Sequence, residues 1–293
     1  MTNGSDFAAL YENIKDIPPV QITVADLVKP EVIEVLKRLQ EENLAELTFI
    51  GETGWIFQLA ERVGLNMSKF KLIHEPQSDE KVVQVAIEEA RKGNIEILMN
   101  GSAGNKYMLE AVLDLKTGLS TNRFFSQLTA LEVPGASKLL FIANTGISSG
   151  PRELVMRDTL MNTLDYLRKL GKKKIRVIVL NIVSPDELPD TYSHIGAAIQ
   201  DISFLEGIGE NYPELILRGP MSLKEAIQGE LPDVLLTPNI ATGEMLCQTL
   251  CGFAGGKAGR LLLGGKVPLI LTINNRTEED IWRSLLLALQ IFK

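Results

Sequence analysis

Short apolar runs alternate with helical segments along this chain, and this alternation is the feature that most restricts its fold. An apolar run of about four to six residues is typical of a buried strand. In the N-terminal part, each run is followed by apolar residues at helical spacing. Repeated strand–helix units predict a parallel sheet with helices on both faces. Strands are expected at residues 21–24, 47–50, 70–74 and 95–99.

Several helix ends carry local signals. Pro30 opens a helix at its first turn, where the missing N–H costs nothing. Ser78 is an N-cap residue, and Gly93 ends the helix that it begins. Further helices are expected at residues 7–14 and 55–63.

The second half repeats this logic after a stretch rich in Gly, Ser, Thr and Asn at residues 118–125, which predicts a crossing between domains. Two apolar runs joined by Pro134 and Gly135 predict a hairpin, and therefore some antiparallel pairing. The expected strands are 128–133, 138–143, 176–180, 215–217 and 234–236, and the expected helices are 152–170, 192–203, 222–226 and 242–254.

The C-terminal stretch combines a buried strand with a polar turn. The run from Val267 to Thr272 predicts the strand, and Thr277 with Asp280 predicts the N-cap of a closing helix. Ligands of open α/β sheets bind outside the carboxyl ends of the strands. The turn at 273–277 is therefore where the sequence predicts chemistry.

Composition limits the possible partners. The chain has 30 basic and 37 acidic side chains and a net charge of -7, which argues against a nucleic-acid or acidic-membrane partner. No apolar run approaches the roughly 20 residues of a membrane span, and no signal region is visible at the start. We expect a cytoplasmic protein with no membrane partner.

Residues that hold metals or act as nucleophiles are scarce. Cys247 and Cys251 share one helix face and lack the other ligands of a zinc site, which predicts free thiols and no metal. His74 and His194 are the only histidines. His194 is interpreted as a surface or capping residue; a general base is the alternative, with no Ser or Cys placed to use it.

Phosphate-binding motifs are also missing. The chain contains neither G-x-G-x-x-G nor the Walker pattern, so dinucleotide and Walker-type phosphate binding are unsupported. The loop from Gly146 to Gly150 either places backbone N–H groups near an anion or needs glycine only for its conformation. The basic cluster at 168–176 is interpreted as a solvated helix end.

Several blocks resemble the phosphate acetyl/butyryltransferase family, in its order and spacing, from about residue 23 to the end. They are AGRLLLGGKVPLILT with the turn and helix after it, DVLLTP starting at Asp233 and leading to Gly243, RGPMSLKEAI starting at Arg218, and ILMNG ending at Gly101. Ser126 with its strand, and the loop ending in Pro151, fit the same family.

The resemblance implies an α/β fold of two α/β/α domains with mostly parallel sheets and an interdomain cleft, like isocitrate/isopropylmalate dehydrogenase. The first domain would comprise 1–124 plus 273–293, and the second, 125–272, would form a homodimer. The family exchanges acyl groups between coenzyme A and phosphate. Coenzyme A or acyl-CoA would thus be a substrate, with no bound cofactor.

The chain departs from the family in its polar residues. Where the family has Thr-Ser-Arg-Ala-Asp-Ser, this chain has the residues from Thr272 to Thr277. The family's serine is replaced by Ile273, the arginine beside it by Asn274, and the aspartate proposed as thiol base by Arg276. An arginine cannot act as that base. An isoleucine offers no donor to an oxyanion, a loss of about 3–4 kcal/mol in such sites.

Other family positions carry neutral or basic groups. Asn100 replaces a lysine, Gln127 a histidine, Asn144 an aspartate and Arg218 an aspartate, whereas Asp233 is kept. Compared with the family, this site has more cations and more neutral donors, and Asn181 is one of these donors; such a site favours a small anionic ligand. The alternative is that these residues lie on a surface that binds no ligand. The candidate ligand-binding residues are Asn100, Gly101, Gln127, Asn144, Arg218, Asp233, Thr272, Asn274, Asn275 and Arg276.

Two hypotheses of function follow. The first is a divergent phosphate acyltransferase in which Asn274, Arg276 and Arg218 bind substrate and no residue is assigned as the base. The second is a catalytically inactive member of the family that binds an anionic small molecule or serves as a subunit of a larger complex.

Overall fold

The computed structural model describes residues 5–26, 29–75, 78–101, 105–147, 151–181, 202–272 and 277–293. The chain forms two compact units. The N-terminal unit comprises residues 11–123 and 259–293, and the central unit comprises residues 1–10 and 124–258. These units are defined by packing within the chain, and the domain division drawn from the family resemblance stays a prediction.

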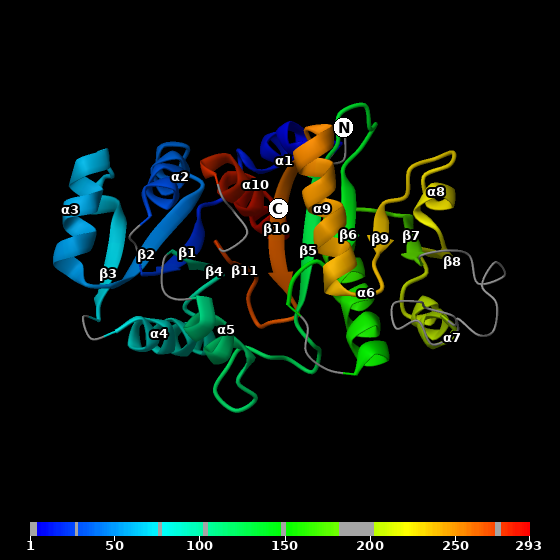
Figure 1. The fold of residues 1–293 in the computed structure, drawn as a ribbon. Coiled ribbons are helices and arrows are strands. Elements are labelled where there is room, and N and C mark those ends of the chain that lie inside the picture. The colour runs from blue at the N-terminus through cyan, green and yellow to red at the C-terminus, as the bar shows by residue number, and fades with distance from the viewer. Residues whose placement is uncertain are drawn as a thin grey trace. The chain divides into compact units, whose positions relative to one another are not determined.

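The N-terminal unit is built on a mostly parallel sheet. The strand order is β3-β2-β1-β4-β11-β10, and only β10 runs antiparallel to its neighbour β11. Helices α2, α3 and α10 lie on one face of this sheet, and α4 and α5 lie on the other (Figure 1). The strands are β1 Val20–Ala25, β2 Ala45–Gly51, β3 Phe70–His74, β4 Ile97–Asn100, β10 Lys257–Leu263 and β11 Leu269–Ile270. The helices are α2 Pro30–Glu41, α3 Thr53–Val63, α4 Asp79–Lys92, α5 Asn105–Leu113 and α10 Glu278–Leu289.

The helix ends of this unit follow the local signals in the sequence. The Ser78 hydroxyl accepts a hydrogen bond from the Lys81 amide at 3.3 Å, and Gly93 ends α4 with a φ of 82°. The Thr277 hydroxyl accepts from the Asp280 amide at 3.1 Å. The Asp280 carboxylate pairs with Arg283 at 3.1 Å. The predicted strand at 267–272 is shorter than expected, because only Leu269 and Ile270 pair with neighbouring strands.

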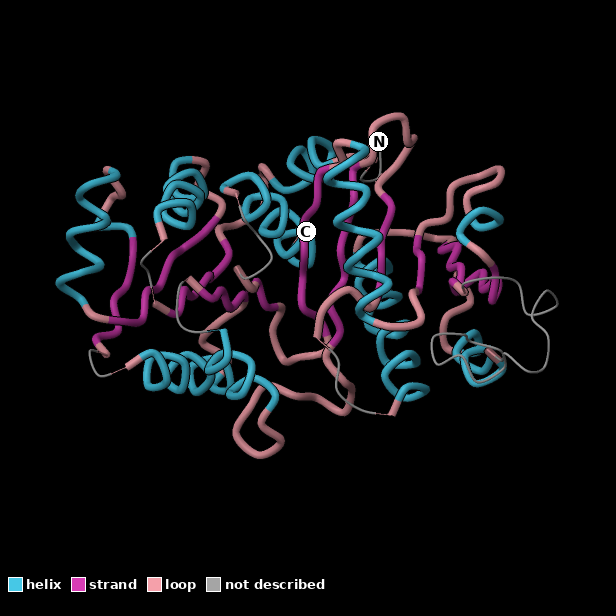
Figure 2. Tube along the Cα trace, viewed as in Figure 1, coloured by secondary structure: helices cyan, strands magenta, loops and turns pink. Residues whose placement is uncertain are grey.

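The central unit also has a mostly parallel sheet, with the strand order β5-β6-β9-β7-β8. Strands β5 and β6 form the predicted antiparallel hairpin, and β6, β9, β7 and β8 are parallel. Figure 2 shows the secondary structure along the same trace. The strands are β5 Ser126–Glu132, β6 Leu140–Ala143, β7 Ile175–Leu180, β8 Leu215–Met221 and β9 Val234–Leu236. The helices are α1 Phe7–Ile14, which continues into the N-terminal unit, α6 Arg152–Lys169, α7 Ser203–Glu206, α8 Leu223–Ala226 and α9 Ile240–Ala254.

Helices α6 and α9 cover opposite faces of the central sheet. Phe141 packs edge-on against Tyr166 of α6, whereas the next strand residue, Ile142, packs with Cys247 of α9. Successive strand residues point to opposite faces, so the two helices lie on either side of β6. Cys247 and Cys251 form no disulfide among the described residues, and Cys247 is buried.

Within the basic cluster at 168–176, which begins in the last turn of α6, both arginines form ion pairs. Arg168 contacts Glu214 at 2.6 Å and lies over the Tyr212 ring. Arg176 contacts Glu230 at 2.7 Å. These partners lie far away in the sequence, which is why the sequence alone did not show them.

The structure bears on the helix expected at 192–203 and on membrane-spanning segments. The helix expected at 192–203 lies outside the described residues except for its last two positions, and Ser203 begins α7. None of the helices in the described segments is long and apolar enough to cross a membrane.

Candidate functional site

The N-terminal unit contains a topological switch point, where the helices that follow two adjacent strands cover opposite faces of the sheet. Strands β1 and β4 are parallel neighbours. Helix α2 follows β1 on one face of the sheet, and α5 follows β4 on the other (Figure 1). The crevice outside the carboxyl ends at such a topological switch point is the usual ligand site of open α/β sheets.

Three predicted site residues lie at this edge. Asn100 ends β4 and pairs in register with Ala25, so Gly101 follows at the level of Asp26. Ile270 of β11 pairs with Met99, which brings Thr272 to the next strand end. Asn100 and Thr272 are buried. The register thus brings Asn100, Gly101 and Thr272 together on two adjacent strands.

Gly101 is required by a close approach of two backbones. A Cβ atom at this position would lie well inside van der Waals contact with the Asp26 carbonyl oxygen. Asp26 itself has a φ of 59°, in the left-handed region that few residues other than Gly, Asn and Asp adopt. The sequence did not single out Asp26, which lies two residues after the predicted strand and directly after β1.

The buried Thr272 hydroxyl follows β11 and has no hydrogen-bond partner among the described residues. Leaving such a donor unsatisfied costs about 1–3 kcal/mol, and a polar atom of this kind is a common feature of functional sites. The turn that follows lies outside the described residues. The predicted site residues on it are Asn274, Asn275 and Arg276, together with Ile273 at the family's serine position.

The central unit has its own switch point, between β6 and β9. These strands are parallel neighbours, and their following helices, α6 and α9, cover opposite faces. Asn144 follows β6 with a φ of 69°, and its Nδ2 donates to the Thr237 carbonyl oxygen at 3.2 Å. Thr237 follows β9 and is fully buried, and its hydroxyl lies 3.0 Å from the Ala143 carbonyl oxygen.

Gln127 joins the same edge from β5, which runs antiparallel to β6. Its Nε2 donates to the carbonyl oxygen of Thr145 over 3.4 Å. The Thr145 hydroxyl shares a hydrogen bond of 2.8 Å with that of Thr129. A Cβ atom on Gly146 would lie 2.5 Å from Gln127 Cδ, so the loop needs glycine there. The structure thus brings Gln127 and Asn144 together, and it adds Thr145 and Thr237, which the sequence analysis did not select.

Arg218 and Asn181 lie on strands farther along the same sheet. Arg218 is exposed on β8, the last strand in the order. Asn181 is buried directly after β7, and its backbone N–H donates to the Met221 carbonyl oxygen at 2.8 Å. Because Arg276 lies outside the described residues, the expected convergence of the two arginines stays a prediction.

Asp233 lies at the other edge of the central sheet, before the first residue of β9. Its carboxylate contacts Lys138 at 2.9 Å and Lys172 at 3.1 Å, and it accepts from the Arg176 amide at 2.9 Å. Burial opposes its ionisation, but the Arg176 amide and the two ammonium groups more than compensate and hold its pKa below the ordinary value. Asp233 therefore stabilises the amino ends of the strands, away from the other candidate residues.

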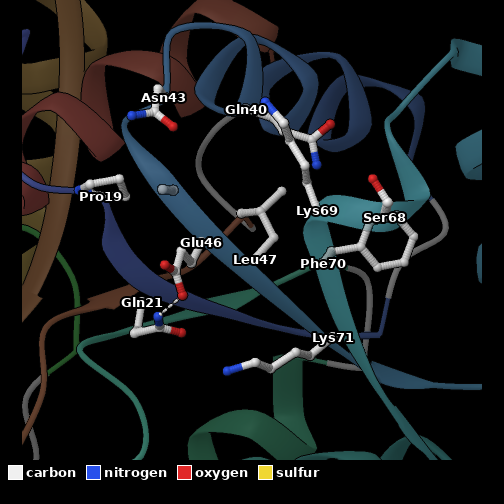
Figure 3. Close-up of a pocket in the computed structure, with 11 residues that line it drawn as sticks. Pro19, Gln21, Gln40, Asn43, Glu46, Leu47, Ser68, Lys69, Phe70 and Lys71 are labelled. Carbon is white, nitrogen blue, oxygen red and sulfur yellow. Dashed lines mark hydrogen bonds between the residues drawn. The ribbon is translucent and has the colours of Figure 1, made fainter.

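A pocket of about 360 Å³ lies at the amino ends of β1, β2 and β3 (Figure 3). Gln21 donates to Glu46 within it, and the Gln40 side chain is held by both backbone groups of Asn66. This pocket lies at the opposite end of the strands from the switch point. It contains none of the predicted site residues.

Metal and histidine chemistry find little support in the described segments. No group of three or more His, Cys, Asp or Glu side chains there could hold a metal ion. His74 ends β3, and its Nδ1 shares a hydrogen bond of 2.7 Å with the Thr53 hydroxyl. His194 lies outside the described residues.

Comparison with solved structures identifies the fold class. The structure resembles a phosphotransacetylase from Streptococcus pyogenes, with a TM-score of 0.76, 14% identity and coverage of 97% of each chain. It also resembles a 4-hydroxythreonine-4-phosphate dehydrogenase from Burkholderia phymatum, with a TM-score of 0.57, 17% identity and coverage of 93% of this chain and 97% of the other. These likenesses confirm the predicted α/β fold class, with mostly parallel sheets of the dehydrogenase-like type.

No family model matches this chain, but several sequence relatives are similar to it along most of its length. The chain is 25% identical over 300 residues to a phosphate butyryltransferase of Clostridium beijerinckii, covering 97% of both proteins. It is 25% identical over 284 residues to a phosphate acetyltransferase of Thermotoga maritima, covering 92% of this chain and 94% of the relative. These relatives confirm the predicted resemblance to the phosphate acetyl/butyryltransferase family.

Proposed function

We propose that this protein transfers acyl groups between coenzyme A and inorganic phosphate. The observation that carries the proposal is the match to a phosphate butyryltransferase along 97% of both chains. A match of that extent includes both units and both strand-end crevices. The comparisons give no support to the second hypothesis, a catalytically inactive member of the family.

The reaction asks three things of a site. The thiol of coenzyme A loses a proton, the acyl carbonyl oxygen gains charge, and the phosphate leaves as an anion. Arg276 and Arg218 supply positive charge for the anion, and Asn274, Asn275 and the unpartnered Thr272 hydroxyl supply donors. No side chain is assigned as the base, because Arg276 holds the family's aspartate position.

Cellular location is part of the same proposal. A cytoplasmic enzyme fits a substrate pair of coenzyme A and phosphate, and the described helices include none that could span a membrane. We propose that the protein works in the cytoplasm without a bound cofactor.

Thioester formation tests the function directly. The purified chain is mixed with coenzyme A and acetyl, propionyl or butyryl phosphate, and the thioester is followed by its ultraviolet absorbance. We expect turnover with at least one acyl phosphate, and the order of kcat/KM values identifies the acyl class. In the reverse direction, acyl-CoA with phosphate should release a thiol that a thiol reagent detects.

Variants of the last turn complete this experiment. Arg276→Ala should reduce turnover by about 10²-fold or more, since it removes a charged contact to the transferred group. The double variant Ile273→Ser/Arg276→Asp restores the family residues and shows whether its usual arrangement outperforms the native one. Absence of turnover in the unmutated protein with every acyl phosphate would refute the proposed function.

A further inference from the structure

The N-terminal unit has a second pocket, on the face of its sheet that α4 covers. Its volume is about 520 Å³, and the C-terminal end of α4 lines it with Glu89, together with Asn94 just beyond the helix. Thr23 of β1, Thr48 of β2 and Lys71 of β3 line it from the sheet. None of the predicted site residues lines this pocket, so it is separate from the strand-end crevices.

The three strand residues form one row across the sheet. Thr23 pairs in register with Thr48, and Thr48 pairs in register with Lys71. Side chains of residues paired in this way lie on the same face of a sheet. In agreement, Figure 3 shows Lys71 leaving β3 on the side opposite to Phe70. The row therefore presents two hydroxyls and one ammonium group to the pocket.

These three groups have no partner within the described part of the chain. Thr23 is only 2% exposed, yet its hydroxyl forms no hydrogen bond with any described residue. The Thr48 hydroxyl and the exposed Lys71 ammonium group are likewise unpaired within these segments. A buried hydroxyl without a partner destabilises the fold, and an acceptor that enters the pocket removes this cost. The row thus has the donors and the charge that an anion needs.

The carboxylates nearest to the row are already engaged. Gln21 donates to the Glu46 carboxylate. Lys92 donates to Glu89 Oε1 and Asn94 to Glu89 Oε2, both at 2.8 Å, and these contacts hold the pKa of Glu89 below its ordinary value. The positive charge of the pocket is therefore one ammonium group, and a ligand with a single negative charge complements it.

A carboxylate fits the row in both geometry and charge. Neighbouring strands lie about 4.8 Å apart, so one oxygen above the gap between Thr23 and Thr48 accepts from each hydroxyl at about 2.8 Å. The second oxygen then faces the Lys71 ammonium group. A phosphate dianion would bring more negative charge than this ammonium group balances, close to the ionised Glu89. Ile73 lies two residues beyond Lys71 on the same face and offers apolar surface to an aliphatic chain.

We propose that this pocket binds a small aliphatic monocarboxylate. The Thr23 and Thr48 hydroxyls donate to the carboxylate, Lys71 pairs with its charge, and the aliphatic chain lies against Ile73. The site does not depend on acyl transfer, and it gives the N-terminal unit a ligand of its own on the face of the sheet.

Amide chemical shifts in nuclear magnetic resonance test the proposal, because they report both where a ligand binds and its Kd. Isotope-labelled protein is titrated separately with butyrate, butylamine and inorganic phosphate. We expect saturable shifts from butyrate at the amides of Thr23, Thr48 and Lys71. Butylamine, of similar length but opposite charge, should cause none there, and phosphate should bind there more weakly than butyrate.

Three variants test the row itself. Thr23→Val removes the buried hydroxyl at nearly constant volume, and Lys71→Met removes the charge; each should raise the Kd for butyrate about 5–10-fold, as for one lost hydrogen bond or ion pair. Thr23→Ser keeps the hydroxyl and should bind nearly as well as the unmutated protein. Lys69→Met is the matched control, because Lys69 is also exposed but does not line this pocket, and its Kd should be unchanged.

The outcomes separate this site from the crevices of the proposed reaction. Butyrate shifts confined to Asn100, Gly101 and the residues near Asn144 would overturn the proposal, as would the absence of any saturable shift. A Kd for butyrate that is unchanged in both Thr23→Val and Lys71→Met would also overturn it. Phosphate that binds the row as tightly as butyrate would overturn the assignment to a monocarboxylate. Butyrate binding at the row in a protein that makes no thioester upholds the proposal and counts only against acyl transfer.

Discussion

Single residues at the strand ends show how closely the backbone is packed there. Gly101 and Asp26 end neighbouring strands of the N-terminal unit, and their main chains touch. Thr272 buries a hydroxyl for which the described part of the chain offers no hydrogen-bond partner. Such features cost stability, and proteins keep them mainly where they serve a site.

Gly101→Ala should destabilise the protein by about 2–3 kcal/mol, because the added methyl group forces the Asp26 carbonyl away. Urea unfolding measures the loss. Gly207→Ala is the control, since its Cβ meets nothing within 4 Å and its φ is ordinary. Equal stability of the two variants would show that the close approach is relieved at no cost.

Thr272→Val tests the role of the unpartnered hydroxyl. Valine has nearly the same shape, and removing an unsatisfied buried donor should leave stability unchanged or raise it by up to about 1 kcal/mol. Under the proposed function, the same change should lower kcat by about 10-fold or more with little change in KM. A loss of stability with unchanged kcat would assign the hydroxyl to the fold instead.

Asp233→Asn should lower stability by about 3 kcal/mol at pH 7, as for a buried ion pair that loses one partner. The pKa of Asp233 is lowered in the folded protein. Its carboxylate therefore stabilises the fold above the unfolded-state value of about 4. This contribution is lost as the pH falls through the folded-state value.

Urea unfolding at a series of pH values checks this dependence. The stability difference between the unmutated protein and Asp233→Asn should be full near pH 7 and should shrink below about pH 4. The control is Glu230→Gln, whose exposed pair with Arg176 should be worth less than about 1 kcal/mol. A difference that stays constant down to low pH would contradict the ionic role of Asp233.

At the scale of elements, helix α6 holds the segment that enters β5. The Asp158 carboxylate accepts from the Phe124 amide at 2.9 Å. Asn162 Nδ2 donates to the Phe124 carbonyl oxygen and to the Ser126 hydroxyl, both at 3.0 Å. Asp158→Ala should cost about 1–3 kcal/mol by leaving the Phe124 amide without its partner.

Hydrogen exchange resolves this effect at the affected position. The Phe124 amide should exchange faster in Asp158→Ala, while amides in the hairpin of β5 and β6 keep their protection relative to global stability. Arg157→Ala is the control, because Arg157 is half-exposed and contacts Asp158 Oδ1, whereas the Phe124 amide donates to Oδ2. Unchanged exchange at Phe124 would contradict the role of α6 in holding this segment.

Elements were predictable where their signals are local. Ser78 and Gly93 each act within one helix turn, and the structure has them as the sequence predicts. Helix α5 was not predicted, because its apolar residues show little amphipathic pattern and no capping signal was recognised before it. The strand order could not be derived, since β9 inserts between β6 and β7 only through contacts distant in sequence.

The candidate site was predictable only in part, for the same reason. Residues after strands were expected at the carboxyl edge, and Asn100, Asn144 and Thr272 lie there. Asp233 precedes its strand, so the opposite edge was its expected place from strand direction alone. The carbonyl oxygens that accept from Gln127 Nε2 and Asn144 Nδ2 lie far from them in sequence, so a sequence does not show these contacts.

At the scale of the whole molecule, the family resemblance implies a homodimer formed by the second domain. Helix α9 of the central unit has the surface that such a dimer needs. Only Gly243 and Cys247 of this helix are buried, whereas Met245 is 68% exposed and Phe253 is 92% exposed. Exposed apolar side chains that share one helix face are a common mark of a contact surface, whereas a single one such as Leu115 is not. We propose that α9 lies in the dimer interface.

Met245→Asp/Phe253→Asp should convert the dimer to monomers, because it places two charges in an apolar contact without partners. Light scattering after size-exclusion chromatography measures the mass of the unmutated protein and of the variant. Leu115→Asp is the control, since Leu115 is also 92% exposed but lies in the N-terminal unit, and this variant should stay dimeric. A dimer that survives the double substitution would place the interface elsewhere, and a monomeric unmutated protein would refute the dimer itself.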